Sequence, residues 1–236
     1  MLLVEGLTVT YGGVRAVDDF SLDVRAGTVM GLIGPNGAGK STTINAITGV
    51  VRRTRGRVHL DGRDLEDRSP QQILVAGMSR TFQQAQLWAG MTVRENIALP
   101  LEAIGESRDR ARRVAEVSDR LGISDLLDLR PGELPFGRRR LVEIARATVT
   151  RPKVVLLDEP GAGLTGAEKT NLVTVLRDLG KGGTAVVLVD HDMELVMGSC
   201  DQVVVLDAGR RLALGTPEVI RDDPAVITAY LGSAPA

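Results

Sequence analysis

The chain has 236 residues, enough for one large domain or two closely packed ones with a sizeable core. Its 29 basic and 30 acidic side chains give a formal net charge of −1, and only 3% of residues are aromatic, which argues against a nucleic-acid-binding protein. One cysteine, Cys200, excludes an internal disulfide framework and a cysteine-rich zinc site.

The N-terminus has no targeting signal that can be recognised. Met1–Val4 run directly into Glu5, which is unlike a signal peptide. No apolar run approaches the length of a membrane span. We therefore expect a soluble protein of the cytoplasm, or one held to a membrane only through a partner.

Short strands are predicted from the N-terminus onward. Leu2–Thr10 and Arg57–Leu60 look like antiparallel strands, with Asp61-Gly62 as a turn. Other runs are apolar nearly throughout, as strands buried on both faces of a largely parallel sheet are. These runs are Thr28–Ile33, Val154–Leu157, Thr184–Val189 and Gln202–Leu206. Helical stretches between them, such as Lys40–Thr48 and Arg138–Thr148, favour an α/β fold.

A helical insert is predicted between about Ala85 and Thr150, interrupting the α/β core. Within it, the block from about Arg108 to Leu121 is charged and carries apolar residues at helical spacing. Those residues are Ala111, Val114, Val117 and Leu121. We interpret the block as an amphipathic surface helix.

A phosphate-binding loop follows the first buried strand. Gly34-Pro-Asn-Gly-Ala-Gly-Lys40-Ser41 fits G-x-x-x-x-G-K-[ST], with a strand before it and a helix after it. Its glycines let backbone N–H groups converge on phosphate oxygens, and the helix start adds partial positive charge. Lys40 would reach the β- and γ-phosphates, and the Ser41 hydroxyl would ligate Mg²⁺. The loop predicts a nucleoside triphosphate site. The sequence lacks the N-K-x-D motif by which GTPases usually recognise guanine.

Two later strands end in acidic residues, at the sheet edge where α/β proteins place ligand chemistry. Asp158 suits Mg²⁺ ligation, usually through water, and Glu159 is placed to polarise an attacking water. His191 could contact the γ-phosphate and orient water and glutamate. Taken singly, the acids could also cap the next helix and the histidine could be structural, while His59 is assigned to the surface.

In this order the motifs resemble the nucleotide-binding subunits of ATP-binding-cassette (ABC) transporters, over essentially the whole chain. The resemblance implies that Tyr11 stacks on adenine, and that Gln83 touches Mg²⁺ and water and signals to the membrane domains. It also implies that Asp158 and Glu159 form the Walker B pair and that His191 is the switch histidine. A solvated loop glutamine and a locally packed tyrosine are the alternatives for the first two.

Two positions depart from the family pattern. The signature L-S-[GY]-G-Q, which reaches across a dimer interface to the opposite subunit's ATP, is here Leu134-Pro135-Phe136-Gly137-Arg138. Pro135 offers neither a hydroxyl nor an N–H, although a helix tolerates proline at its first position and the change could be silent. Thr165 stands where the family usually has Asn or Asp, at a position that the resemblance links to communication between the two ATP sites.

Further segments resemble the ATPases of branched-chain amino-acid importers, and those for urea and short amides are similar. The segments are Arg80–Gln84, Met91–Asn96, Asp190–Met197, Gly215–Glu218 and Ala229–Gly232. Lipopolysaccharide-export ATPases are the nearest alternative. A soluble ABC ATPase of DNA repair or translation would carry coiled coils, zinc modules or tandem cassettes, which this chain lacks. A nucleotide-binding partner with little turnover of its own is the third hypothesis.

The resemblance implies a P-loop NTPase of α/β class, with a RecA-like core and antiparallel β-subdomain at about 1–84 and 151–236 and the helical insert at about 85–150. A head-to-tail dimer would hydrolyse MgATP and drive a membrane permease from the cytoplasmic face of the inner membrane. A second, similar ATPase is the favoured dimer partner, with a homodimer as the alternative, and no nucleic acid is expected. Leu87-Trp88 would form part of a groove for a permease helix, unless Trp88 is an interior residue of the insert.

Each predicted site residue then has a role. Gln83, Glu159 and His191 are catalytic, and Ser41, Gln83 and Asp158 hold Mg²⁺. The expected ATP contacts within the chain are Tyr11, Gly34, Pro35, Asn36, Gly37, Ala38, Gly39, Lys40, Ser41 and Thr42. Pro135, Phe136, Gly137 and Arg138 would face the ATP of the opposite subunit.

Overall fold

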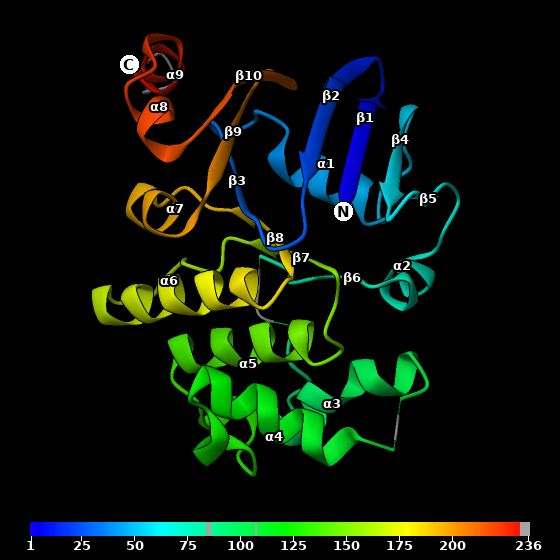
Figure 1. The fold of residues 1–236 in the computed structure, drawn as a ribbon, viewed down its shortest axis with the longest axis vertical. Coiled ribbons are helices and arrows are strands. Elements are labelled where there is room, and N and C mark those ends of the chain that lie inside the picture. The colour runs from blue at the N-terminus through cyan, green and yellow to red at the C-terminus, as the bar shows by residue number, and fades with distance from the viewer. Residues whose placement is uncertain (84–85, 107, 232–236) are drawn as a thin grey trace.

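The computed structural model describes residues 1–83, 86–106 and 108–231. Two sheets lie at one end of the molecule and in its middle, and a group of helices forms the other end (Figure 1). Within the described ranges, no helix combines the length and the apolar character that a membrane crossing requires. The predicted boundary of the insert at 84 and 85 falls outside the described residues.

The smaller sheet is antiparallel, with strand order β2-β1-β4-β5. Its strands are β1 (Leu2–Tyr11), β2 (Val14–Val24), β4 (Arg55–Leu60) and β5 (Arg63–Asp64). Two of them were predicted, and β2 was not. Gly12 and Gly13, both with positive φ, make the tight turn between β1 and β2.

The larger sheet has strand order β10-β9-β3-β8-β7-β6 and is parallel except for β10, which pairs antiparallel with β9. Its strands are β3 (Val29–Ile33), β6 (Met78–Arg80), β7 (Val154–Asp158), β8 (Ala185–Val189), β9 (Gln202–Asp207) and β10 (Arg210–Gly215). The four predicted parallel strands are confirmed to within one residue at each end. All residues of β3, β7 and β8 are buried, as their unbroken apolar sequences indicate.

Two hydrophobic clusters cover the faces of the larger sheet. Helix α1 (Lys40–Ile47) lies between the small sheet and one face of the larger sheet, and Met30 and Leu32 of β3 point into that cluster. Val29 and Ile33 point to the other face, against the remaining helices. Those helices are α3 (Val93–Ala103), α4 (Arg110–Leu121), α5 (Phe136–Thr148), α6 (Gly166–Lys181), α7 (Met193–Ser199), α8 (Pro217–Arg221) and α9 (Pro224–Leu231), with α2 (Pro70–Ala76) beside β6.

Helices α3, α4 and α5 pack on one another and form the end of the molecule away from the small sheet (Figure 1). In α4, Val114 and Leu121 are buried and Val117 is half-buried, as predicted, but Ala111 is exposed and Ser118 is buried in its place. Helix α5 begins at Phe136 rather than at the predicted Arg138.

Candidate active site

The phosphate loop connects β3 to α1, and two of its glycines are required by the backbone. Gly34 has φ 148°, and a Cβ there would lie 2.0 Å from the Leu206 carbonyl oxygen. Gly39 has φ 103°, and a Cβ there would lie 2.4 Å from the Ala16 carbonyl oxygen. Backbone oxygens of the neighbouring strands β9 and β2 therefore leave no room for a side chain, and only glycine fits at both positions.

Lys40 lies between this loop and the acidic strand ends. Its Nζ donates to the carbonyl oxygens of Gly34 at 2.7 Å and Pro35 at 3.0 Å. Burial lowers the pKa of Lys40, and the carboxylates of Glu159 and Asp158 oppose that shift. The ammonium group is thus held next to both acids, at the start of a helix, where a triphosphate would be attracted.

The two acids at the end of β7 have different surroundings. Asp158 is buried, which raises the pKa of its carboxyl group, and the Arg80 guanidinium opposes that shift. Its backbone N–H donates to Thr81 Oγ1 at 3.1 Å. Glu159 has φ 48°, an uncommon left-handed conformation for a non-glycine residue, and its N–H donates to the Val189 carbonyl oxygen at 2.7 Å. This bend turns Glu159 out of the strand direction while Asp158 stays inside.

The other two predicted catalytic side chains, Gln83 and His191, lie beside Glu159. Gln83 Nε2 donates to Glu159 Oε2 at 3.0 Å. His191 Nδ1 lies 4.0 Å from Glu159 Oε1 and 3.8 Å from Asp190 Oδ1. Because His191 is largely exposed, its ring is accessible from the open side of the site. The structure therefore joins three segments that are distant in sequence at one carboxylate.

The predicted metal ligands fit Mg²⁺ in kind. Ser41, Gln83 and Asp158 offer a hydroxyl, an amide and a carboxylate oxygen, the donors that Mg²⁺ prefers. Among the described residues no cluster of three or more His, Cys, Asp and Glu side chains could hold a metal by itself. A few protein ligands supplemented by phosphate and water is the arrangement typical of Mg²⁺ with a nucleotide.

Tyr11 ends β1 at the hairpin beside the phosphate loop. It pairs with Val14 across the hairpin and is 49% exposed. The backbone of Ala16, on the other strand of this hairpin, lies against Gly39 of the loop, and the exposed tyrosine ring is accessible to a flat ligand. Its contact with adenine stays a prediction.

The altered signature occupies the start of α5. Pro135 is the N-cap rather than the first helical residue, and it makes no side-chain cap hydrogen bond. Arg138 Nη1 donates to the Gly122 carbonyl oxygen at 2.7 Å, so its guanidinium is bound to the C-terminus of α4. Gly137 lies directly against Glu168, where a Cβ would meet Oε1 at 2.0 Å.

Thr165 has a structural role that the sequence comparison alone did not suggest. It is the N-cap of α6 in a capping box with Glu168, whose Oε2 accepts from both the Thr165 N–H and hydroxyl at 2.9 Å. Asn, one of the residues usual in the family, is an equally good cap.

We expect Thr165→Ala to lower the free energy of unfolding by about 1 kcal/mol, and Thr165→Asn to change it by less than about 0.5 kcal/mol, in a chemical denaturation series. Thr170→Ala, on an exposed turn of the same helix, is the matched control and should be neutral or slightly stabilising, because alanine has the higher helix propensity. Equal losses from Thr165→Ala and Thr165→Asn would contradict the capping role.

Residues of α5 that the motif analysis missed hold the segment around Gln83. Arg140 is buried and donates to the carbonyl oxygens of Phe82 and Gln83. Glu143 accepts from the Gln86 N–H at 3.0 Å, and Arg146 donates to the Gln86 carbonyl oxygen at 2.6 Å. The sequence pattern that could have indicated this role is the pair Arg140 and Glu143, spaced i, i+3 on an otherwise apolar helix face. Charged side chains are rarely buried unless they are paired.

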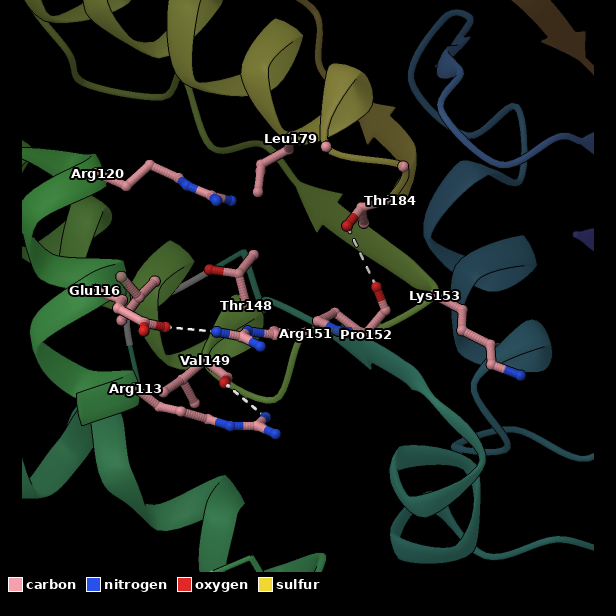
Figure 2. A pocket seen from close by; sticks show the side chains of 13 residues that line it. Arg113, Glu116, Arg120, Thr148, Val149, Arg151, Pro152, Lys153, Leu179 and Thr184 are labelled. Carbon is pink, nitrogen blue, oxygen red and sulfur yellow. Dashed lines mark hydrogen bonds and ion pairs between the residues drawn. The ribbon is translucent and has the colours of Figure 1, made fainter. Parts of the chain in front are cut away.

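A separate cavity of about 450 Å³ lies at the amino ends of the parallel strands, opposite the ends that carry the nucleotide site (Figure 2). It lies between α4, the segment before β7 and the segment before β8, at the amino ends of these strands. Figure 2 shows Arg151 directed at Glu116, with Nη2 2.5 Å from the carboxylate. We interpret this cavity as a gap in the packing between α4 and the core rather than as part of the nucleotide site.

Comparison with known proteins agrees with this geometry. The sequence profile of the ABC transporter family matches residues 17–162, and that of the branched-chain amino acid ATP-binding cassette transporters matches residues 210–236. The high-affinity branched-chain amino acid transport ATP-binding protein LivG of Salmonella typhimurium is 39% identical, over 99% of this chain and 98% of the relative.

Two further matches cover nearly the whole chain. The lipopolysaccharide export system ATP-binding protein LptB of Haemophilus influenzae is 34% identical, over 98% of this chain and 97% of the relative. The crystal structure of the ADP conformation of MJ1267, an ATP-binding cassette of an ABC transporter, has a TM-score of 0.89 at 31% identity, over 98% of both chains. The predicted fold class is confirmed.

Proposed function

The chain belongs to the ATP-binding proteins of ABC transporters, and on that basis we propose that it is the ATP-hydrolysing subunit of an importer for branched-chain amino acids or related small amides. Nearly full-length similarity to LivG supports the cargo class, as does the match of residues 210–236 to the branched-chain family. The observation that carries the chemistry is the grouping of Gln83, His191 and Lys40 around Glu159.

In this proposal the phosphate loop and Lys40 hold the triphosphate, and Tyr11 stacks on adenine. Mg²⁺, held by Ser41, Gln83 and Asp158, would neutralise charge on the phosphates. Glu159 accepts a proton from the attacking water; a hydrogen bond from Gln83 orients the carboxylate, and His191 lies 4.0 Å away. These roles carry the family's motifs onto the matching residues of this chain.

We further propose a head-to-tail dimer in which Pro135, Phe136, Gly137 and Arg138 face the ATP of the other subunit. With the Arg138 guanidinium bound to Gly122, the remaining anion-binding groups are backbone N–H groups at the start of α5. A partner ATPase with a signature closer to the family pattern would then give the transporter one site of full activity. The heterodimer is therefore favoured over the homodimer.

A groove beside the active site is the proposed docking place for a permease helix. Its volume is about 260 Å³, and it lies between α2, β6 and the facing parts of α3 and α5. Its apolar wall includes Ile73, Leu74, Phe82 and Pro100. Neither Leu87 nor Trp88 is among the lining residues, contrary to the expectation that they form part of this groove. Leu87 packs partly buried against the core, while the Trp88 side chain is 63% exposed, contrary to the alternative of an interior tryptophan. Docking there would place the protein at the cytoplasmic face of the membrane.

Trp88 is held in its exposed position by Asn96, which bonds to both its backbone N–H and its carbonyl oxygen. We expect Trp88→Ala to weaken association with the membrane subunits by about ten-fold or more, since an exposed aromatic is a typical anchor, and to leave ATP affinity unchanged. A pull-down with the permease measures the first, and nucleotide titration the second. Val219→Ala, at another exposed apolar residue, is the control, and an unchanged pull-down of folded Trp88→Ala would refute the assignment.

Lipopolysaccharide export is the second candidate function, because LptB is 34% identical. The match of residues 210–236 to the branched-chain family favours the importer. Purification of the complex from membranes, followed by identification of the permease subunits, distinguishes the two. Permease subunits of an exporter type would exclude the proposed cargo.

A further inference from the structure

Arg80, at the end of β6, contacts both the C-terminal end of α1 and the acid Asp158 at the end of β7. Its guanidinium Nη1 donates to Asn45 Oδ1 at 2.7 Å and to Thr48 Oγ1 at 3.0 Å; Asn45 lies near the C-terminal end of α1, and Thr48 is the C-cap of that helix. Its Nη2 lies 3.7 Å from Asp158 Oδ2. The Arg80 side chain is only 10% exposed, so these contacts are made largely away from water.

The same guanidinium faces the docking groove. Its central carbon lies 4.3 Å from the centroid of the Phe82 ring, a cation–π contact, and both residues line the groove. Thr81, between them, accepts from the Asp158 N–H and donates its own N–H to the Leu156 carbonyl oxygen. Three consecutive residues thus connect the groove wall to the end of β7.

Only arginine can make this set of contacts. Its planar fork bonds to two acceptors on α1 while its face stacks on an aromatic ring, whereas lysine offers a single point charge. The Phe82 ring stacks on the guanidinium, and the guanidinium is bonded to α1 and adjacent to Asp158. The contacts form one continuous path from groove to active site.

We propose that Arg80 is a positioning residue that transmits occupancy of the groove to Asp158 and α1, in partnership with the Phe82 ring. The inference rests on the proposed function in taking the groove's occupant to be a permease helix. Arg80 touches none of the residues Gly34 to Thr42 in the hydrogen bonds and ion pairs of the described chain. Its role is therefore separable from the contacts that the phosphate loop makes with the nucleotide.

The test compares Arg80→Lys, Phe82→Leu and the double variant in the reconstituted transporter. The measured quantity is the ratio of ATPase rates with and without the permease. We expect each single variant to lower this ratio by about ten-fold, and the double variant to lower it no further, because coupled residues are non-additive. ATP affinity without divalent metal should stay within about three-fold of wild type for Arg80→Lys.

Two further variants keep the test decisive. Thr48→Val removes one acceptor of the guanidinium and should lower the ratio in the same direction, which covers the case that Arg80→Lys fails to fold. Leu74→Glu places a charge on the apolar wall of the groove and should abolish association. The inference about Arg80 fails, while the docking site stands, if Leu74→Glu blocks association but Arg80→Lys keeps full stimulation by the permease. It fails in the same way if the effects of Arg80→Lys and Phe82→Leu multiply in the double variant. If Leu74→Glu still associates, the docking site fails, and the inference with it.

Discussion

Replacing Glu159 by glutamine is expected to reduce ATP hydrolysis by about a hundred- to ten-thousand-fold while ATP binding is retained. The amide has nearly the shape of the carboxylate but cannot accept the proton of the attacking water. Among the described acids, Glu159 alone contacts both Gln83 and His191, and Asp158 beside it is buried. Glutamine can also adopt the φ of 48° at this position as readily as glutamate, so the fold should be unchanged.

Steady-state ATPase activity of the assembled transporter measures this effect, and equilibrium nucleotide binding measures what is retained. Glu194→Gln is the matched control, because Glu194 is an exposed acid in the first turn of α7, just after His191. The control should hydrolyse ATP at the wild-type rate. A Glu159→Gln rate within a few-fold of wild type would show that another group activates the water.

The second large effect concerns the two unequal ATP sites of the proposed heterodimer. Disabling this chain's Lys40 should reduce transport more than disabling the matching lysine of the partner, because the site built on Lys40 faces the partner's intact signature. The partner's ATP faces Pro135, which cannot donate a hydrogen bond. Losing one charge-assisted bond to phosphate costs about 1.5–3 kcal/mol, or roughly ten- to a hundred-fold in the step that needs it.

Pro135→Ser separates the signature from other differences between the subunits. It restores a hydroxyl at the N-cap of α5, where serine is also a good cap, and should raise turnover at the partner's site. Lys181→Ala, on an exposed turn of α6, is a control for loss of a lysine charge. Equal losses from the two lysine variants, with no gain from Pro135→Ser, would show that the altered signature is silent. Efficient turnover by this chain as a homodimer would remove the need for the partner.

Much of the fold was predictable because the local pattern and the tertiary environment agree. The runs Val154–Leu157 and Thr184–Val189 are apolar throughout, and strands buried on both faces need such sequences. β2 was not predicted because its polar residues, such as the adjacent Asp18 and Asp19, interrupt the apolar pattern that is typical of a strand. The hairpin with β1 and packing against the core determine its structure instead.

The sequence names candidate site residues, but not how they are arranged. The phosphate loop is a continuous motif, so its shape follows from local glycines. The contacts of Gln83 and His191 with Glu159 depend on strand order, which brings the ends of β6, β7 and β8 together. The sequence also left open where the Arg138 guanidinium points, and its bond to Gly122 depends on how α4 packs beside α5.

The most direct test of the proposed function is uptake by the purified transporter. Vesicles would carry this chain with its co-purified permease and partner ATPase, with MgATP on the side of the ATPases and labelled leucine, isoleucine or valine on the other. We expect saturable, ATP-dependent accumulation of at least one of them, lost when Glu159→Gln replaces the wild-type chain. Accumulation that is unaffected by Glu159→Gln, or no uptake of these amino acids or of small amides by an ATPase-active complex, would contradict the proposal.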